Sequence, residues 1–81
     1  MTLARLPVGA SARVTAIDEA SPVASRLHDL GFVPGTAVRS IRRAPLGDPT
    51  LYEVRGAQLC LRRSEAEHVL VDPLGPEAPA R

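Results

Sequence analysis

The chain has 81 residues and a formal net charge of +1, with 44% apolar and 23% charged side chains. These values are ordinary for one folded domain, and a chain this short buries only about 60% of the surface that its unfolded form exposes. A deep catalytic pocket would take up much of so small a core, so we expect no enzyme. The near-neutral charge and the lack of a long apolar run argue against a nucleic-acid partner and against direct membrane insertion.

Cysteine usage indicates the compartment. Cys60 is the only cysteine, which excludes an intramolecular disulfide and a thiolate cluster for zinc and fits a reducing environment. The N-terminal residues lack the basic segment and apolar run that mark a secretory signal. We therefore expect a cytoplasmic protein.

The first predicted strand covers residues 12–17, because apolar and polar side chains alternate there. Ala12, Val14 and Ala16 fall on one side of this strand, and Arg13, Thr15 and Ile17 fall on the other.

A short helix is predicted next. Ser21 suits the N-cap, Pro22 suits the first helical position, and Gly31 suits a left-handed C-terminal cap. The residues that recur along one face of this helix are Val23, Leu27 and Leu30. So short a helix is stable only when this face packs on a sheet.

The second predicted strand, residues 36–43, has an irregular alternation. Val38 and Ile41 fall on opposite sides of an ideal strand. A β-bulge would bring both onto one face, as the strong bend of a small barrel requires.

The remaining elements follow a loop at residues 45–49 that contains two prolines. Residues 50–55 and 57–62 alternate on either side of a glycine and predict a hairpin. Residues 64–67 predict a capping box that begins one helical turn, and residues 69–71 predict the last strand.

Five short strands with one inserted α-helix and a short helical turn predict a mainly β protein, and in about 70 residues such elements favour a small closed β-barrel. An open sheet would leave long unpaired edges. We expect the domain to cover residues 1–72 and residues 73–81 to form a flexible proline-rich tail.

Four segments carry a resemblance to a known family. Residues 26–35 match the pattern Arg-Leu-x-x-Leu-Gly-hydrophobic-x-Pro-Gly, and residues 44–49, 54–62 and 65–71 supply three further signatures in the same order. With these signatures, residues 3–71 resemble the ferrous-iron transport protein A (FeoA) family. A diluted form of the pattern also occurs at the C-terminus of iron-dependent repressors. No DNA-binding helices precede the pattern here, so we do not expect a repressor.

The resemblance implies an SH3-like β-barrel that acts as a non-enzymatic accessory of ferrous-iron uptake. It implies docking on the cytosolic GTP-binding part of the ferrous-iron permease, which would hold the chain at the inner face of the cell membrane. Two alternatives stay open, namely a metal-responsive regulatory module and a GTPase-activating partner of the permease. A homodimer also stays open.

The expected contact surface has two segments, a turn and a loop, with Arg43 beside the loop. They consist of Phe32, Val33, Pro34 and Gly35, and of Pro45, Leu46, Gly47, Asp48 and Pro49. The two prolines stiffen the loop, so an apolar residue at its tip loses little entropy on binding. Arg42 or Arg43 could also serve as an arginine finger. Binding of single-stranded RNA is disfavoured, because the chain has only two aromatic residues for stacking.

The candidate metal ligands are His28 and His68, which lie forty residues apart and form no His-x-x-x-His pair. We expect no required cofactor. A weakly bound divalent ion, iron or zinc, would bridge one of these histidines to a neighbouring chain rather than occupy a site within one chain.

Overall fold

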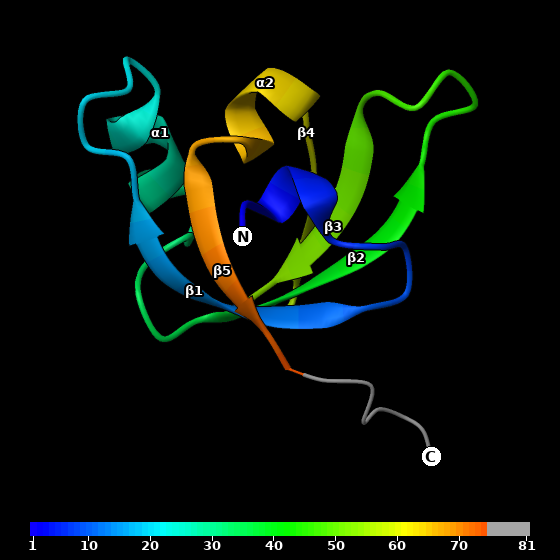
Figure 1. Ribbon diagram of the computed structural model, residues 1–81, viewed down its shortest axis with the longest axis horizontal. Helices are drawn as coiled ribbons and strands as arrows, with labels where there is room; N and C mark the ends of the chain where they lie inside the picture. The colour runs from blue at the N-terminus through cyan, green and yellow to red at the C-terminus, as the bar shows by residue number, and fades with distance from the viewer. Residues whose placement is uncertain (75–81) are drawn as a thin grey trace.

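The structure, a computed structural model, describes residues 1–74. Five antiparallel strands form one curled sheet in the order β4-β3-β2-β1-β5 (Figure 1). The mainly β prediction, with five strands and two short helices, is confirmed. The elements in chain order are a 3₁₀ helix η1 (Leu3–Arg5), β1 (Ser11–Ile17), α1 (Ala24–Asp29), β2 (Ala37–Arg43), β3 (Thr50–Val54), β4 (Ala57–Leu61), α2 (Arg63–Ala66) and β5 (Val69–Pro73).

The sheet does not close into a continuous hydrogen-bonded barrel. Among residues 1–74, β4 pairs with β3 alone and β5 pairs with β1 alone in the sheet order, so the predicted barrel is not closed by a ladder between β4 and β5. The 3₁₀ helix η1, which the sequence did not predict, packs on α2 and on β5. The buried Tyr52 hydroxyl of β3 donates to the Leu3 carbonyl of η1 at 3.4 Å. Short helices and side chains thus close the barrel in place of another ladder.

The core inside the curled sheet is aliphatic apart from Phe32 and Tyr52, both almost fully buried. Leu3 and Leu6 reach it from the N-terminal segment, and Leu27 reaches it from α1. The remaining large members are Val14, Ile17, Val38, Val54, Leu61, Val69 and Val71.

Two bulges switch which residues face this core. In β2 the register shifts between Ser40 and Arg42, which confirms the bulge predicted there, although Ile41 is only half-buried. In β1 the pairing with β5 shifts between Val14 and Ala16. Because of this second bulge, Ile17 is buried and Ala16 is only half-buried, so the predicted alternation is wrong at that end of the strand.

Helix α1 begins later than the sequence predicts. Ser21 does not cap it, because its hydroxyl accepts the Val23 N–H at 3.2 Å and its carbonyl accepts the Ala24 N–H at 3.2 Å in a separate tight turn. The helix therefore starts at Ala24, not at Pro22.

The C-terminal end of α1 follows the prediction. Gly31 has φ +107° and its N–H bonds to the His28 carbonyl at 3.0 Å. The next N–H, of Phe32, reaches back to the Leu27 carbonyl at 3.0 Å. These two bonds define a Schellman motif, and the buried side chains of Leu27 and Phe32 supply its usual apolar contact.

Helix α2 also differs from its predicted capping box. Arg62 takes the N-cap position, and its N–H donates to the Glu65 Oε1 at 2.9 Å. Glu65, not Glu67, is thus the residue that reaches back to the start of the helix, so the predicted box is wrong in register. The other Glu65 oxygen pairs with Arg26 of α1. One carboxylate therefore caps α2 and links it to α1.

The described chain continues beyond the expected boundary at Asp72. Pro73 pairs with Ala12, and the Leu74 N–H donates to the Ser11 carbonyl at 3.0 Å. The rest of the predicted flexible tail, residues 75–81, lies outside the described residues. No helix in residues 1–74 is long and apolar enough to cross a membrane.

Candidate functional site

The loop between β2 and β3 has a fixed backbone. The Ala44 N–H donates to the Pro49 carbonyl at 3.0 Å across its base, and the Gly47 N–H donates to the Ala44 carbonyl at 2.7 Å in a tight turn. Pro45 and Leu46 form the corners of that turn. The Leu46 side chain is 96% exposed, so the fold presents a leucine to solvent on a rigid support.

A side-chain bond anchors the same loop to α2. The Asp48 carboxylate accepts the Arg63 backbone N–H at 2.9 Å. Arg63 is the first residue of α2, and such N–H groups have no partner within their own helix. The loop is therefore held at its base by backbone bonds and along its side by α2.

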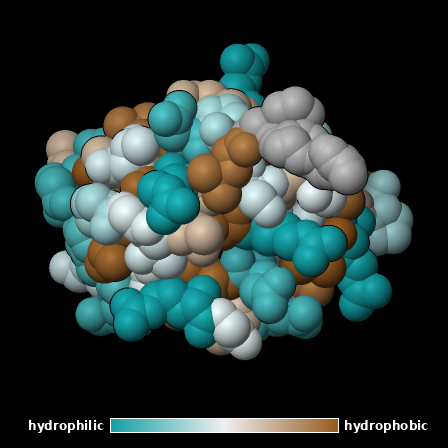
Figure 2. Space-filling model, turned by 90° about the horizontal axis from the view of Figure 1, so that it is seen from below, coloured by the Kyte–Doolittle hydropathy of each residue, from teal (hydrophilic) through white to brown (hydrophobic). Residues whose placement is uncertain are grey.

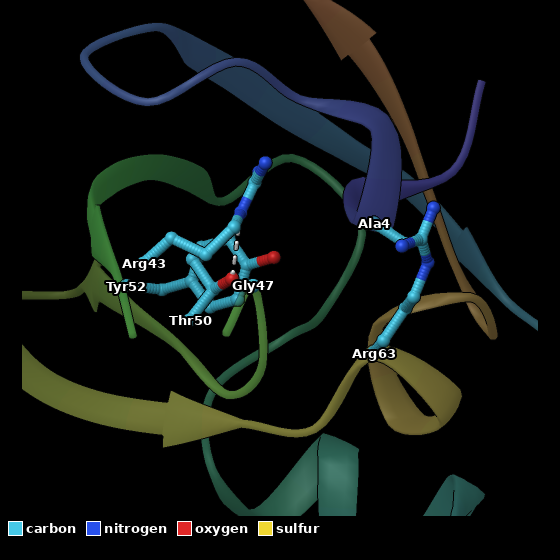
Figure 3. Close-up of a pocket in the computed structure, with 6 residues that line it drawn as sticks. All are labelled: Ala4, Arg43, Gly47, Thr50, Tyr52 and Arg63. Carbon is cyan, nitrogen blue, oxygen red and sulfur yellow. Dashed lines mark hydrogen bonds between the residues drawn. The ribbon is translucent and has the colours of Figure 1, made fainter. Parts of the chain in front are cut away.

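A cavity of about 30 Å³ lies behind the loop, lined by Ala4, Arg43, Gly47, Thr50, Tyr52 and Arg63 (Figure 3). The Arg43 Nε donates to the Thr50 hydroxyl at 3.2 Å, and its Nη2 donates to the Leu6 carbonyl at 3.3 Å. Arg43 thus braces the loop against the N-terminal segment. Burial raises the pKa of the Tyr52 phenol above its ordinary value of 10.0, against smaller lowering effects of Thr50 and Arg43.

The two hydrogen bonds of Arg43 argue against its predicted use as an arginine finger. A finger must extend into a partner's active site, and Arg43 would have to give up both of its bonds to do so. The side chain of the neighbouring Arg42 is exposed and forms no hydrogen bond or ion pair within residues 1–74. Of the two arginines, Arg42 is the one that is free to reach a partner.

A wider groove of about 520 Å³ runs from the loop across the outer face of the sheet. The pairing places Arg42 beside Leu51 and Leu51 beside Cys60, in one row across β2, β3 and β4. The other lining residues are Arg43, Ala44, Pro45 and Pro49. The groove therefore combines an apolar floor with positive charge, and no acidic residue among residues 1–74 lines it.

The predicted turn does not join this surface. Phe32 is fully buried in the core, so its assignment to the contact surface is wrong; Pro34 and Gly35 are exposed and Val33 is half-buried. The turn precedes β2 whereas the loop follows it, and the seven residues of β2 separate them by roughly 20 Å. The two predicted segments therefore lie at opposite ends of one strand.

The two histidines each contact one carboxylate. The His28 Nε2 lies 2.9 Å from the Glu19 Oε2, and the His68 Nδ1 lies 3.2 Å from the Asp18 Oδ2. Residues 1–74 contain no group of three or more His, Cys, Asp or Glu side chains that could hold a metal ion. Sequence reasoning missed that both partners are neighbours in the turn after β1, although the Asp18-Glu19 pair was visible.

Other exposed apolar side chains are more scattered. On the face seen from below, apolar residues form separate patches among polar ones (Figure 2). The large exposed ones besides Leu46 are Met1, Val8, Leu70 and Leu74, each less than 50% exposed. Leu46 is therefore the most accessible large apolar residue that the structure describes.

These features define a class of protein. The chain is a small SH3-like β-barrel, and its described surface offers a rigid loop, an open groove and strand edges. The residues it brings together are suited to contact with another molecule.

Comparisons with known proteins agree with this class and narrow it. Residues 1–73 match the family model described as FeoA domain, and the chain belongs to this family. The chain is 43% identical to a FeoA protein from Chlorobium tepidum, with a TM-score of 0.83 over 93% of this chain and 71% of that one. It is 41% identical to FeoA from Stenotrophomonas maltophilia, solved with zinc and described as a prokaryotic SH3 domain protein, with a TM-score of 0.80 over 89% of each chain.

Two further proteins that the chain resembles are much longer than this chain. A fusion of Fe(2+) transport protein A with the Fe(2+) transporter FeoB, from Porphyromonas gingivalis, is 28% identical over 78 residues, which are 96% of this chain and 9% of the fusion protein. A manganese-dependent transcriptional repressor is 20% identical, with a TM-score of 0.82 over 91% of this chain and 36% of the repressor. The repressor likeness concerns the fold alone.

Proposed function

We propose that the chain is a non-enzymatic accessory protein of ferrous-iron uptake that docks on the cytosolic GTP-binding part of the ferrous-iron permease. In this role it is cytoplasmic and is held at the inner face of the cell membrane by its partner. The observation that carries the proposal is the 96% exposure of Leu46 on a loop fixed by bonds to Ala44, Pro49 and α2.

Two considerations support this proposal. A leucine held rigidly in solvent gains apolar burial on binding and loses little conformational entropy. The Porphyromonas gingivalis relative carries transport protein A and the transporter FeoB in one chain, which keeps the two at high effective concentration. A separate chain needs a contact surface to reach the same proximity.

Retention on membranes tests the proposal. Tagged protein is incubated with membranes that contain the permease, and the bound permease is quantified. Because a central apolar contact contributes about 2 kcal/mol or more, Leu46→Asp should lower retention at least about tenfold. Leu70→Asp is the matched control, since Leu70 is a leucine that is 41% exposed on β5. Equal retention of both variants would refute docking through the loop.

We also propose that divalent metal binding by a single chain is weak. His28 with Glu19 and His68 with Asp18 each offer only two ligands, whereas transition metals in stable protein sites take three or four. We expect isothermal titration with zinc or ferrous ion to show no micromolar site in the monomer. A micromolar site that His28→Ala or His68→Ala removes would contradict this and favour the metal-responsive alternative.

A further inference from the structure

The two edges of the sheet differ in how they are protected. Strand β5 carries Asp72 and Pro73, and an isolated bridge between Thr2 and Leu70 covers part of its edge. Strand β4 has the sequence Ala-Gln-Leu-Cys-Leu, without a charge or a proline. Within residues 1–74, no backbone bond joins its outer edge to another segment. Natural sheets guard free edges with charges, prolines or covering segments, and β4 has none of these.

The hairpin turn shows which backbone groups of β4 are free. Arg55 and Gly56 form a two-residue turn with φ +55° and +81°, as a type I′ turn requires. In such a hairpin the flanking residues, Val54 and Ala57, exchange both of their hydrogen bonds. The pattern then alternates along the strand, so the N–H and C=O groups of Gln58 and Cys60 point away from β3. These two residues present donors and acceptors at the spacing of a further antiparallel strand.

The charges around β4 indicate what such a strand carries. Arg55 precedes β4, Arg62 follows it, and Arg42 lies in the row that ends at Cys60. None of the three forms an ion pair within residues 1–74. A second copy of the chain would bring its own arginines close to these arginines, and the like charges would repel each other. An acidic segment would instead be attracted to them.

We propose that the free edge of β4 binds an extended segment of a partner protein as a sixth strand, with acidic side chains of that segment beside Arg62, which directly follows β4. The inference rests on the proposed function, because the partner is the one that docks on the loop at residues 44–49. The groove connects the two places, since Pro45 and Pro49 line one end and Cys60 the other. Strand addition uses main-chain bonds for affinity and side-chain contacts for specificity.

A proline at position 60 tests the contact at the free edge of β4 without breaking the pairing of β4 with β3. The Cys60 N–H points away from β3, so Cys60→Pro keeps the β3–β4 ladder and removes a donor from the free edge. Its conservative counterpart is Cys60→Val, which keeps the amide. With membranes that contain the permease, we expect retention of the proline variant to be about tenfold below that of the valine variant. Thermal unfolding of both variants checks the fold.

Each outcome decides a different point. Equal retention of Cys60→Pro and Cys60→Val, with Leu46→Asp still defective, overturns strand addition and leaves docking through the loop intact. No retention of the wild type overturns the docking function and this inference with it. Loss of self-association in Cys60→Pro, without loss of permease retention, identifies a second copy as the occupant and overturns the partner strand.

Hydrogen exchange of the wild type keeps the inference testable if Cys60→Pro does not fold. Solubilised permease should slow exchange of the Gln58 and Cys60 amides, because both would donate to the added strand. Unchanged exchange at these two amides, while residues 44–49 become protected, overturns strand addition.

Discussion

At the scale of single residues, two buried hydroxyls have different surroundings. The Ser40 hydroxyl has no hydrogen-bond partner among the described residues, whereas the Thr50 hydroxyl accepts a bond from Arg43. Removal of an unsatisfied buried group is neutral or stabilising, while loss of a bonded partner costs about 1 kcal/mol. We therefore expect Ser40→Ala to keep or raise the free energy of unfolding and Thr50→Val to lower it by about 1 kcal/mol. Urea unfolding measures both, and an equal loss in the two variants would contradict this account.

A second residue-scale prediction concerns alkaline pH. Tyr52 is the only tyrosine and the chain has no lysine. Burial raises its pKa above 10.0 in the folded state. The folded protein therefore keeps a proton that the unfolded chain has lost, so the stability linked to Tyr52 is complete below pH 10.0 and falls as pH rises through the higher folded pKa. Urea unfolding measures the free energy of unfolding from about pH 9 to about pH 12, the range around the ordinary phenol pKa. Tyr52→Phe should make this free energy decline less steeply with pH. A decline as steep as that of the wild type would refute the assignment of the effect to Tyr52.

At the scale of elements, Glu65 joins both helices. It accepts the N-cap N–H of α2 and pairs with Arg26 of α1, whereas Glu67 forms only an exposed contact with Arg63 at 3.8 Å. We expect Glu65→Ala to lower the free energy of unfolding by about 1–2 kcal/mol and Glu67→Ala by less than about 0.5 kcal/mol. Thermal or urea unfolding compares them. Similar losses would mean that the link between the helices contributes nothing.

The sequence predicted the elements where a local signal decides them. Glycine at the end of α1 gave the Schellman motif, and the slipped alternation around Val38 and Ile41 gave the bulge in β2. The predicted start of α1 is wrong because Ser21 and Pro22 favour a tight turn as well as the start of a helix. The means by which the barrel closes was not predicted, because packing of η1 against α2 joins residues some sixty positions apart, and local patterns carry no information about such contacts.

The sequence also predicted part of the candidate site, again where a local signal decides the structure. Two prolines and a glycine around Leu46 indicate a stiff loop, and the exposed leucine agrees with that expectation. Phe32 was misassigned because its place in the sequence, after Gly31, does not show that its side chain turns back into the core. The free edge of β4 was missed, since strand order becomes known only once the sheet is assembled.

At the scale of the whole molecule, the barrel is a rigid support for surfaces at its rim. The loop at residues 44–49, the groove and the edge of β4 adjoin one another, and Arg42 and Arg43 line the groove. Such a distribution favours an acidic partner surface and faster association at low salt.

The most direct test of the docking account is the affinity of the purified chain for the isolated cytosolic GTP-binding part of the permease, measured by biolayer interferometry. We expect saturable binding by the wild type and by Leu70→Asp, with the dissociation constant of Leu46→Asp at least about tenfold higher. No binding by the wild type, or equal binding by Leu46→Asp, would contradict docking of the loop on this part of the transporter.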